Sequence, residues 1–111
     1  MPPIDRLSRP VDILTYEIVQ ERAAALGRLG RGLEAALADL REFDATHPHL
    51  GASSEERQTR RTLVTAASHA LWMFVVQREA SGLHESRTVM RDYKVPAEVQ
   101  ERMGVFPATR K

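Results

Sequence analysis

The sequence predicts an all-α fold, in which an antiparallel hairpin of two long helices is followed by two short C-terminal helices. Apolar residues recur at heptad spacing, on one line at Val19, Leu26, Leu33 and Leu40 and on the adjacent line at Tyr16, Ala23, Gly30 and Leu37. Of the 111 residues, 42% are hydrophobic and only 5% are aromatic, and this balance favours helices. A chain of this length is expected to form one domain around one modest core.

The first long helix is predicted to run from about Asp12, a suitable N-cap, to about Asp44, a length of about 50 Å. Three glycines interrupt it, at Gly27, Gly30 and Gly32. Each costs about 1 kcal/mol relative to alanine in a helix interior. The glycines therefore either kink the helix or form a notch that accepts Trp72 or lets two backbones approach closely.

The second long helix is expected after a connecting loop over residues 46–52, which contains a proline and a glycine and has no apolar period. Ser53 followed by Glu56 fits a capping box and marks the start of the helix. Gly82 and Leu83 predict a Schellman-type stop at its end.

Two short helices follow, at about residues 85–93 and at about residues 96–103, where the second begins at a proline. Together the four helices predict a single helical domain over residues 11–104. A flexible, proline-rich arm over residues 1–10 is expected before it, and a loose tail over residues 105–111 after it.

Matching the two long helices at equal distances from the loop places Leu26 and Gly27 near Leu71 and Trp72. The same register brings a basic cluster at the start of the second helix close to an acidic cluster at the end of the first. These clusters are Arg57, Arg60 and Arg61, and Asp39, Glu42 and Asp44. Intramolecular pairing is the favoured interpretation of the basic cluster, with a solvated face and a phosphate or nucleic-acid site as alternatives.

The predicted hairpin has more apolar surface than one copy can cover. Off the main seam lie Ile13, Leu14, Ile18, Leu29 and Ala36 on the first helix and Trp72, Met73 and Val76 on the second. A homodimeric helical bundle is therefore expected, and an unknown protein partner is a further possibility. The residues predicted to pack in the core or at the dimer interface are Val19, Leu26, Gly30, Leu33, Leu37, Leu40, Leu71, Trp72, Phe74 and Val75.

The charge balance excludes a strong global field. Sixteen Lys and Arg residues against fifteen Asp and Glu residues leave a formal charge of +1, so attraction to nucleic acid is not expected. The chain contains no cysteine, which suits a reducing compartment. Its longest apolar run, residues 70–76, is far shorter than a membrane span, and the N-terminus lacks the apolar region of a signal peptide. A cytoplasmic protein without membrane contact is expected.

No catalytic, cofactor or metal site is predicted. His47 and His49 with Asp44 nearby resemble a metal site, but no further ligand stands at a standard spacing. His69 lies beside Ser68, yet adjacent helix positions point apart and no acid orients the imidazole. The glycine run of the first helix fits neither a P-loop nor a Rossmann turn.

A regulatory module that binds nucleic acid or protein through the C-terminal helices is the main functional alternative. Residues 90–99 have the outline of a helix-turn-helix. In such a motif Glu98 and Glu101 would face phosphates, which leaves only Gln100 and Arg102 to contact bases. Packing of two small helices onto the second long helix is therefore the favoured interpretation.

The C-terminal part of the chain combines Trp72, Val76-Gln77-Arg78-Glu79, Gly82-Leu83, Met90-Arg91-Asp92-Tyr93, Pro96 and Arg102-Met103-Gly104. With these residues it resembles a family of small uncharacterised bacterial proteins, a domain of unknown function. Tyr16-Glu17-Ile18 and Gln20-Glu21 extend the resemblance over most of the chain. The resemblance implies a bacterial, soluble, helical protein and brings no catalytic residues.

The stretch from Tyr16 to Leu37 is also similar to the long first helix of the all-α chorismate mutases, which are intertwined helical dimers. This similarity implies that Arg22 and Arg28 would hold a dicarboxylate. A small enzyme or ligand binder at a dimer interface is therefore a third alternative.

If the chain carries a polar site, we expect it where the second long helix ends, at Gln77, Arg78, Glu79, Asp92 and Tyr93. The structural alternative is that Arg78 and Asp92 pair and hold the third helix in place. The function that the sequence favours is a non-catalytic, homo-oligomeric interaction or scaffold protein.

Overall fold

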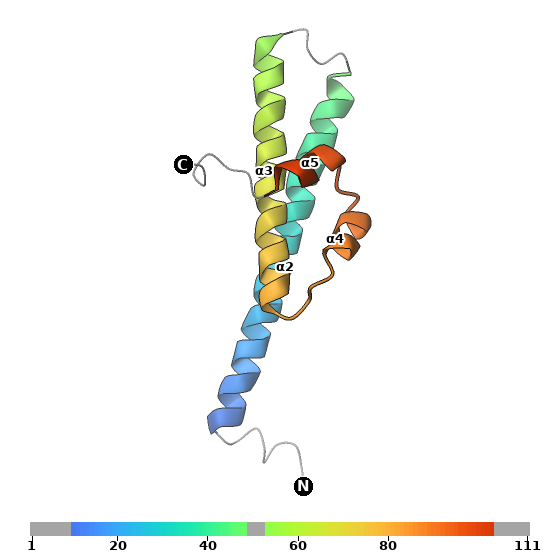
Figure 1. The fold of residues 1–111 in the computed structure, drawn as a ribbon. Helices are drawn as coiled ribbons and strands as arrows, with labels where there is room; N and C mark the ends of the chain where they lie inside the picture. The colour runs from blue at the N-terminus through green and yellow to red at the C-terminus, as the bar shows by residue number, and fades with distance from the viewer. Residues whose placement is uncertain (1–9, 49–52, 104–111) are drawn as a thin grey trace, which may run out of the picture.

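The computed structural model describes residues 10–48 and 53–103, and in these ranges it is entirely helix, turn and loop (Figure 1). It confirms the all-α fold with two long and two short helices. The long helices are α2, Pro10–Thr46, and α3, Ser54–Ala80, and the short ones are α4, Ser86–Asp92, and α5, Ala97–Arg102. The predicted arm lies outside the described residues except for Pro10, which begins α2, and the predicted tail lies wholly outside them.

Helix α2 is continuous through all three glycines. Thirty-seven residues at about 1.5 Å each make it about 55 Å long. Figure 1 shows that its N-terminal part extends well beyond the end of α3, whereas its C-terminal part lies alongside α3. The Cα radius of gyration is 18.9 Å, against about 13 Å for a compact domain of this length.

The ends of α3 carry the predicted caps. The Ser53 hydroxyl accepts a hydrogen bond from the Glu56 amide at 3.0 Å, which satisfies one of the free donors of the first turn. At the other end Gly82 has a φ of +91°, and the Leu83 amide donates to the Arg78 carbonyl at 2.8 Å. This is the predicted Schellman stop, and it turns the chain back toward the hairpin.

The two helices of the hairpin are antiparallel, with a register different from the predicted one. Asp44 bonds to Arg60, and Gly30 lies beside Phe74. This alignment places Ala24 level with the last residue of α3, so that residues 10–24 have no part of α3 beside them.

The core forms where all four helices meet. Its fully buried side chains are Leu33, Leu37, Leu40, Leu71, Val89 and Val99, with Ala67 and Ser68 between them. Seven of the residues predicted for core or interface packing are buried here: Gly30, Leu33, Leu37, Leu40, Leu71, Phe74 and Val75. Leu26 is half-buried, whereas Val19 and Trp72 are exposed.

The glycines form a notch at one position only. A Cβ on Gly30 would lie 3.0 Å from the Tyr93 hydroxyl and 3.5 Å from the Phe74 ring. The notch does not accept Trp72, which was one of the two uses predicted for it, because Phe74 is the residue at this level. Trp72 lies on the outer face of α3 and is 41% exposed. Phe74 and Tyr93 meet edge to face with their ring centroids 5.5 Å apart, which fixes the segment after α4 against the hairpin.

A buried serine attaches α5 to α3. The Ser68 hydroxyl is within hydrogen-bonding distance of the Val64 carbonyl at 2.8 Å and the Val99 carbonyl at 3.0 Å, and Ser68 is fully buried. Ser68→Ala is expected to lower the free energy of unfolding by about 1–2 kcal/mol, because the buried Val99 carbonyl loses its donor. Urea denaturation measures this change. Thr62→Ala is the matched control, since the Thr62 hydroxyl makes the same type of bond to Gln58 on the surface, and a loss as large as that of Ser68→Ala would contradict this account.

Candidate interaction surface

The N-terminal segment of α2, residues 10–24, is exposed along almost its whole length. Its large apolar side chains keep much of their surface in water, with Val11 at 65%, Leu14 at 57% and Val19 at 57% exposure. Ile13, Tyr16 and Ile18 are also exposed. Six large apolar residues within nine positions are more than scattered surface residues, and Val11, Leu14 and Ile18 share one side of the helix, as is typical of an interaction site.

The outer face of α3 carries a second, smaller apolar group. Trp72, Met73 and Val76 point away from the core and are about two-fifths exposed. Trp72 stacks loosely on His69, with ring centroids 6.3 Å apart. The off-seam residues that predicted a second copy therefore lie on the surface of the single chain, with Leu29 and Ala36 half-buried.

The structure does not assemble the predicted polar cluster at the end of α3 into one site. Arg78 donates to the Glu85 carbonyl at 3.3 Å and lies over the Phe74 ring at 5.9 Å. Asp92 bonds to its neighbour Arg91 at 3.4 Å. The predicted Arg78–Asp92 pair is absent from the ion pairs of the described residues, because Arg78 turns to the ring and to the chain after the Schellman stop.

The remaining members of that cluster separate in the same way. Tyr93 packs into the Gly30 notch, Gln77 is half-buried and Glu79 is exposed. Asp92 and Tyr93 line a hollow of about 700 Å³ together with Glu34, Leu37, Arg41 and Lys94. Its acidic and basic groups are mixed, so it presents no single charge to a ligand.

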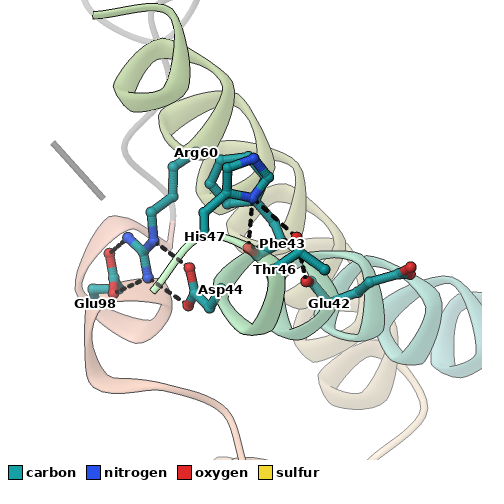
Figure 2. Close-up of polar contacts among 7 residues, drawn as sticks. All are labelled: Glu42, Phe43, Asp44, Thr46, His47, Arg60 and Glu98. Atoms are coloured by element: carbon teal, nitrogen blue, oxygen red, sulfur yellow. Dashed lines mark hydrogen bonds and ion pairs between the residues drawn. The ribbon is translucent and has the colours of Figure 1, made fainter. Parts of the chain in front are cut away.

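A polar contact between three helices is centred on Arg60 (Figure 2). Its Nε donates to Asp44 Oδ1 at 2.7 Å and its Nη1 to Glu98 Oε2 at 2.7 Å. Its Nη2 donates to the second oxygen of each carboxylate, at 3.0 Å for Asp44 and 2.9 Å for Glu98. One guanidinium thus makes two bidentate bonds and connects α2, α3 and α5.

The pairing between Arg60 and Asp44 agrees with the predicted meeting of the basic and acidic clusters. Glu98 was the partner that sequence reasoning missed, because it lies 38 positions away in the chain, on a different helix. Hydrogen bonds from Arg60 lower the pKa of Glu98 and of Asp44 below their ordinary values. Both carboxylates therefore stay ionised at neutral pH. Their two negative charges pair with the positive charge of Arg60 within the chain.

A hollow of about 250 Å³ lies next to Arg60 and is lined by Arg57, Arg61, Val64 and Arg102 as well as Glu98. Arg61 donates to the Gln58 side chain at 2.6 Å and Arg102 to the Thr65 hydroxyl at 3.4 Å. A phosphate site formed by these arginines stays a prediction of the sequence, as an alternative to intramolecular pairing of the basic cluster.

The residues considered for DNA contact are engaged within the chain. Gln100 donates from its side chain to the Val95 carbonyl at 3.0 Å, and Val99 is fully buried. Glu98 is bonded to Arg60. Helix α5 is thus a packing element of the domain, as the favoured interpretation expected.

Among the described residues, no group of three or more His, Cys, Asp or Glu side chains is arranged to hold a metal ion. His47 stacks on Phe43 with centroids 4.0 Å apart and lies 2.9 Å from the Phe43 carbonyl (Figure 2). His49, its predicted companion, lies outside the described residues. No helix in the described part of the chain has the length and apolar character needed to span a membrane.

The fold and its surface define a small all-α protein, in which, within the described residues, a helical hairpin is covered on one side by two short helices and extended by the exposed N-terminal segment of α2. The chain belongs to a family of unknown function, DUF6665, whose model matches residues 6–111. Searches of curated proteins and of solved structures returned no match. The family membership confirms the resemblance noted in the C-terminal residues and assigns no activity to any of them.

Proposed function

We propose that this protein is a non-catalytic interaction protein that works as a homodimer, and that the N-terminal segment of α2 is its interaction element. The observation that carries this proposal is the exposure of Val11, Ile13, Leu14, Tyr16, Ile18 and Val19 on a part of α2 that no other helix of the described residues accompanies. We place it in the cytoplasm, a reducing compartment that suits a chain without cysteine and therefore without disulfides.

The energy available from covering this segment is comparable to that of a micromolar dimer. Complete burial of one such side chain stabilises by about 1.5–3 kcal/mol, so the three half-exposed side chains on one side, Val11, Leu14 and Ile18, represent about 2–5 kcal/mol per copy. Two copies double this gain. A micromolar dimer corresponds to about 8 kcal/mol.

The helix itself also requires a partner. Residues 10–24 include five β-branched residues, Val11, Ile13, Thr15, Ile18 and Val19, which have below-average helix propensity. An isolated helical segment of about 15 residues is marginal in water even with better helix formers. Packing against a second copy supplies the tertiary contact that keeps this segment helical.

The double variant Leu14→Glu with Ile18→Glu tests the proposal. Burial of these carboxylates is costly, so the dissociation constant is expected to rise at least a hundred-fold, and the variant should sediment as a monomer at micromolar concentration. Sedimentation velocity or light scattering at several protein concentrations measures this. The parent chain should behave as a dimer in the same concentration range.

Gln20→Glu is the control, because it adds a charge of the same sign to the same segment on the opposite side of the helix from Val11 and Ile18. Its dissociation constant should remain within a few-fold of the parent value. A parent chain that is monomeric at micromolar concentration would refute the proposal.

A further inference from the structure

We infer that the second copy packs antiparallel to the first along α2, with the two-fold axis between Ala24 and Ala25. Each N-terminal segment then lies on the partner's hairpin, at the side that α4 leaves open. The inference rests on the proposed function, because it describes how the same dimer is built. Three properties of α2 support it: the position of its apolar stripe, the side of the hairpin that stays uncovered, and the order of its charges.

The apolar stripe of the N-terminal segment continues into the hairpin on the same side of α2. Val11, Ile18 and Ala25 are seven residues apart, and Leu14 lies between the first two. Leu29 and Ala36 prolong this side at the same spacing. They are only half-buried and flank the core seam of Gly30, Leu33 and Leu37.

The short helices do not cover this side. Glu34 and Arg41 of α2 line the hollow shared with Asp92 and Tyr93, so the α4 region lies on the opposite flank of the core seam. At Gly32 an added Cβ would meet nothing within 4 Å. The side of α2 that contains Leu29, Gly32 and Ala36 is therefore accessible to a second chain.

The charges of α2 distinguish an antiparallel from a parallel pair. Glu17 and Glu21 precede the proposed axis, and Arg28 and Arg31 follow it at nearly equal distances. An antiparallel partner therefore places Glu21 opposite Arg28 and Glu17 close to Arg31, whereas a parallel partner places like charges together. Within one chain Arg28 and Glu21 approach to only 3.7 Å with side chains 60% and 76% exposed, so both remain available to the partner.

The same axis matches large side chains with small ones. Leu14 falls level with position 35 of the partner helix, between its Gly32 and Ala36. Ile18 falls level with position 31, between Leu29 and Gly32. Near the axis the two helices meet through Ala25, whose small side chain allows a close approach.

Cysteine cross-linking tests this arrangement directly, since the chain contains no cysteine of its own. Leu14→Cys and Ala36→Cys are made as single variants and mixed in equal amounts under mild oxidation. The expected result is a covalent dimer that contains one chain of each variant, identified by mass. The two positions lie 22 residues apart on one helix, about 33 Å, so a bond within one chain cannot account for it.

The outcomes separate this inference from the proposed function. The antiparallel register is wrong if Leu14→Cys cross-links to itself more readily than to Ala36→Cys. It is also wrong if the mixture does not cross-link although the parent sediments as a dimer. In both cases the proposal of a homodimer is retained. A monomeric parent overturns both.

Gln20→Cys mixed with Ala36→Cys is the control and should give no covalent dimer, because Gln20 lies on the other side of α2. Ionic strength supplies a second measurement. Added salt should weaken an antiparallel dimer held by opposite charges and strengthen a parallel one, and strengthening would contradict the inference.

Discussion

Gly30→Leu is expected to lower the free energy of unfolding by about 2–3 kcal/mol, even though leucine is the better helix former by nearly 1 kcal/mol. The added Cβ would lie 3.0 Å from the Tyr93 hydroxyl and 3.5 Å from the Phe74 ring, and the rest of the leucine side chain needs the space that these rings occupy. Their displacement would disrupt the edge-to-face contact that holds the segment after α4. Urea denaturation followed by circular dichroism measures the change.

Gly27→Leu is the matched control, because it makes the same substitution one turn earlier on the same helix. An added Cβ at Gly27 meets only the mobile guanidinium of Arg31, at 3.2 Å at the nearest. Its stability should be equal to that of the parent or higher. If Gly30→Leu is as stable as Gly27→Leu, the notch has no structural role.

Arg60→Ala is expected to lower the free energy of unfolding at neutral pH by about 1–3 kcal/mol. It removes both bidentate contacts and leaves Asp44 and Glu98 close together without a cation. The lower part of this range applies if solvent screens the carboxylates strongly, since their side chains are 45% and 47% exposed. Arg61→Ala is the control, because within the described residues Arg61 bonds to the neutral Gln58 side chain one turn away, and the loss of stability should stay within about 0.5 kcal/mol.

The contribution of Arg60 should also depend on pH. Because the pKa values of Glu98 and Asp44 are lowered in the folded state, the unfolded chain binds protons more readily than the folded one as the pH falls through about 4. The stabilisation is therefore fully present at neutral pH and is lost as acid protonates the folded carboxylates. Stability curves of the parent and of Arg60→Ala should converge below about pH 4, and a constant difference over this range would exclude the ion pairs as its source.

Local sequence signals predicted the helices well. The heptad spacing of α2 is a property of neighbouring turns, so the sequence is enough to recognise it. The Ser53 cap and the Gly82 stop depend on residues within five positions of each other, and both appear in the structure as predicted. The pairing of Arg60 with Asp44 followed from the antiparallel arrangement, since both lie close to the connecting loop.

Contacts between distant helices were harder to predict. A shift of a few residues between α2 and α3 brings Phe74 to Gly30, and no local pattern in either helix specifies that shift. Trp72 is on the surface because it lies on the outer face of α3. Arg78 was matched with Asp92 on charge alone, but the path of the chain after Gly82 places its guanidinium on Phe74 and on the Glu85 carbonyl. The role of Glu98 depends on where α5 packs, which its six residues do not reveal.

The sequence by itself determined the four helices, their caps and the surplus of apolar side chains, because helix periodicity and capping are read from residues close together in the chain. Only the tertiary structure decided where that surplus lies. Since α3 ends level with Ala24 and the chain then turns back along the hairpin, Val11, Leu14 and Ile18 are left on a part of α2 beside which no other described helix lies. That position depends on the register of two helices, which is set by packing at Gly30 and by the bonds of Arg60 rather than by any local pattern.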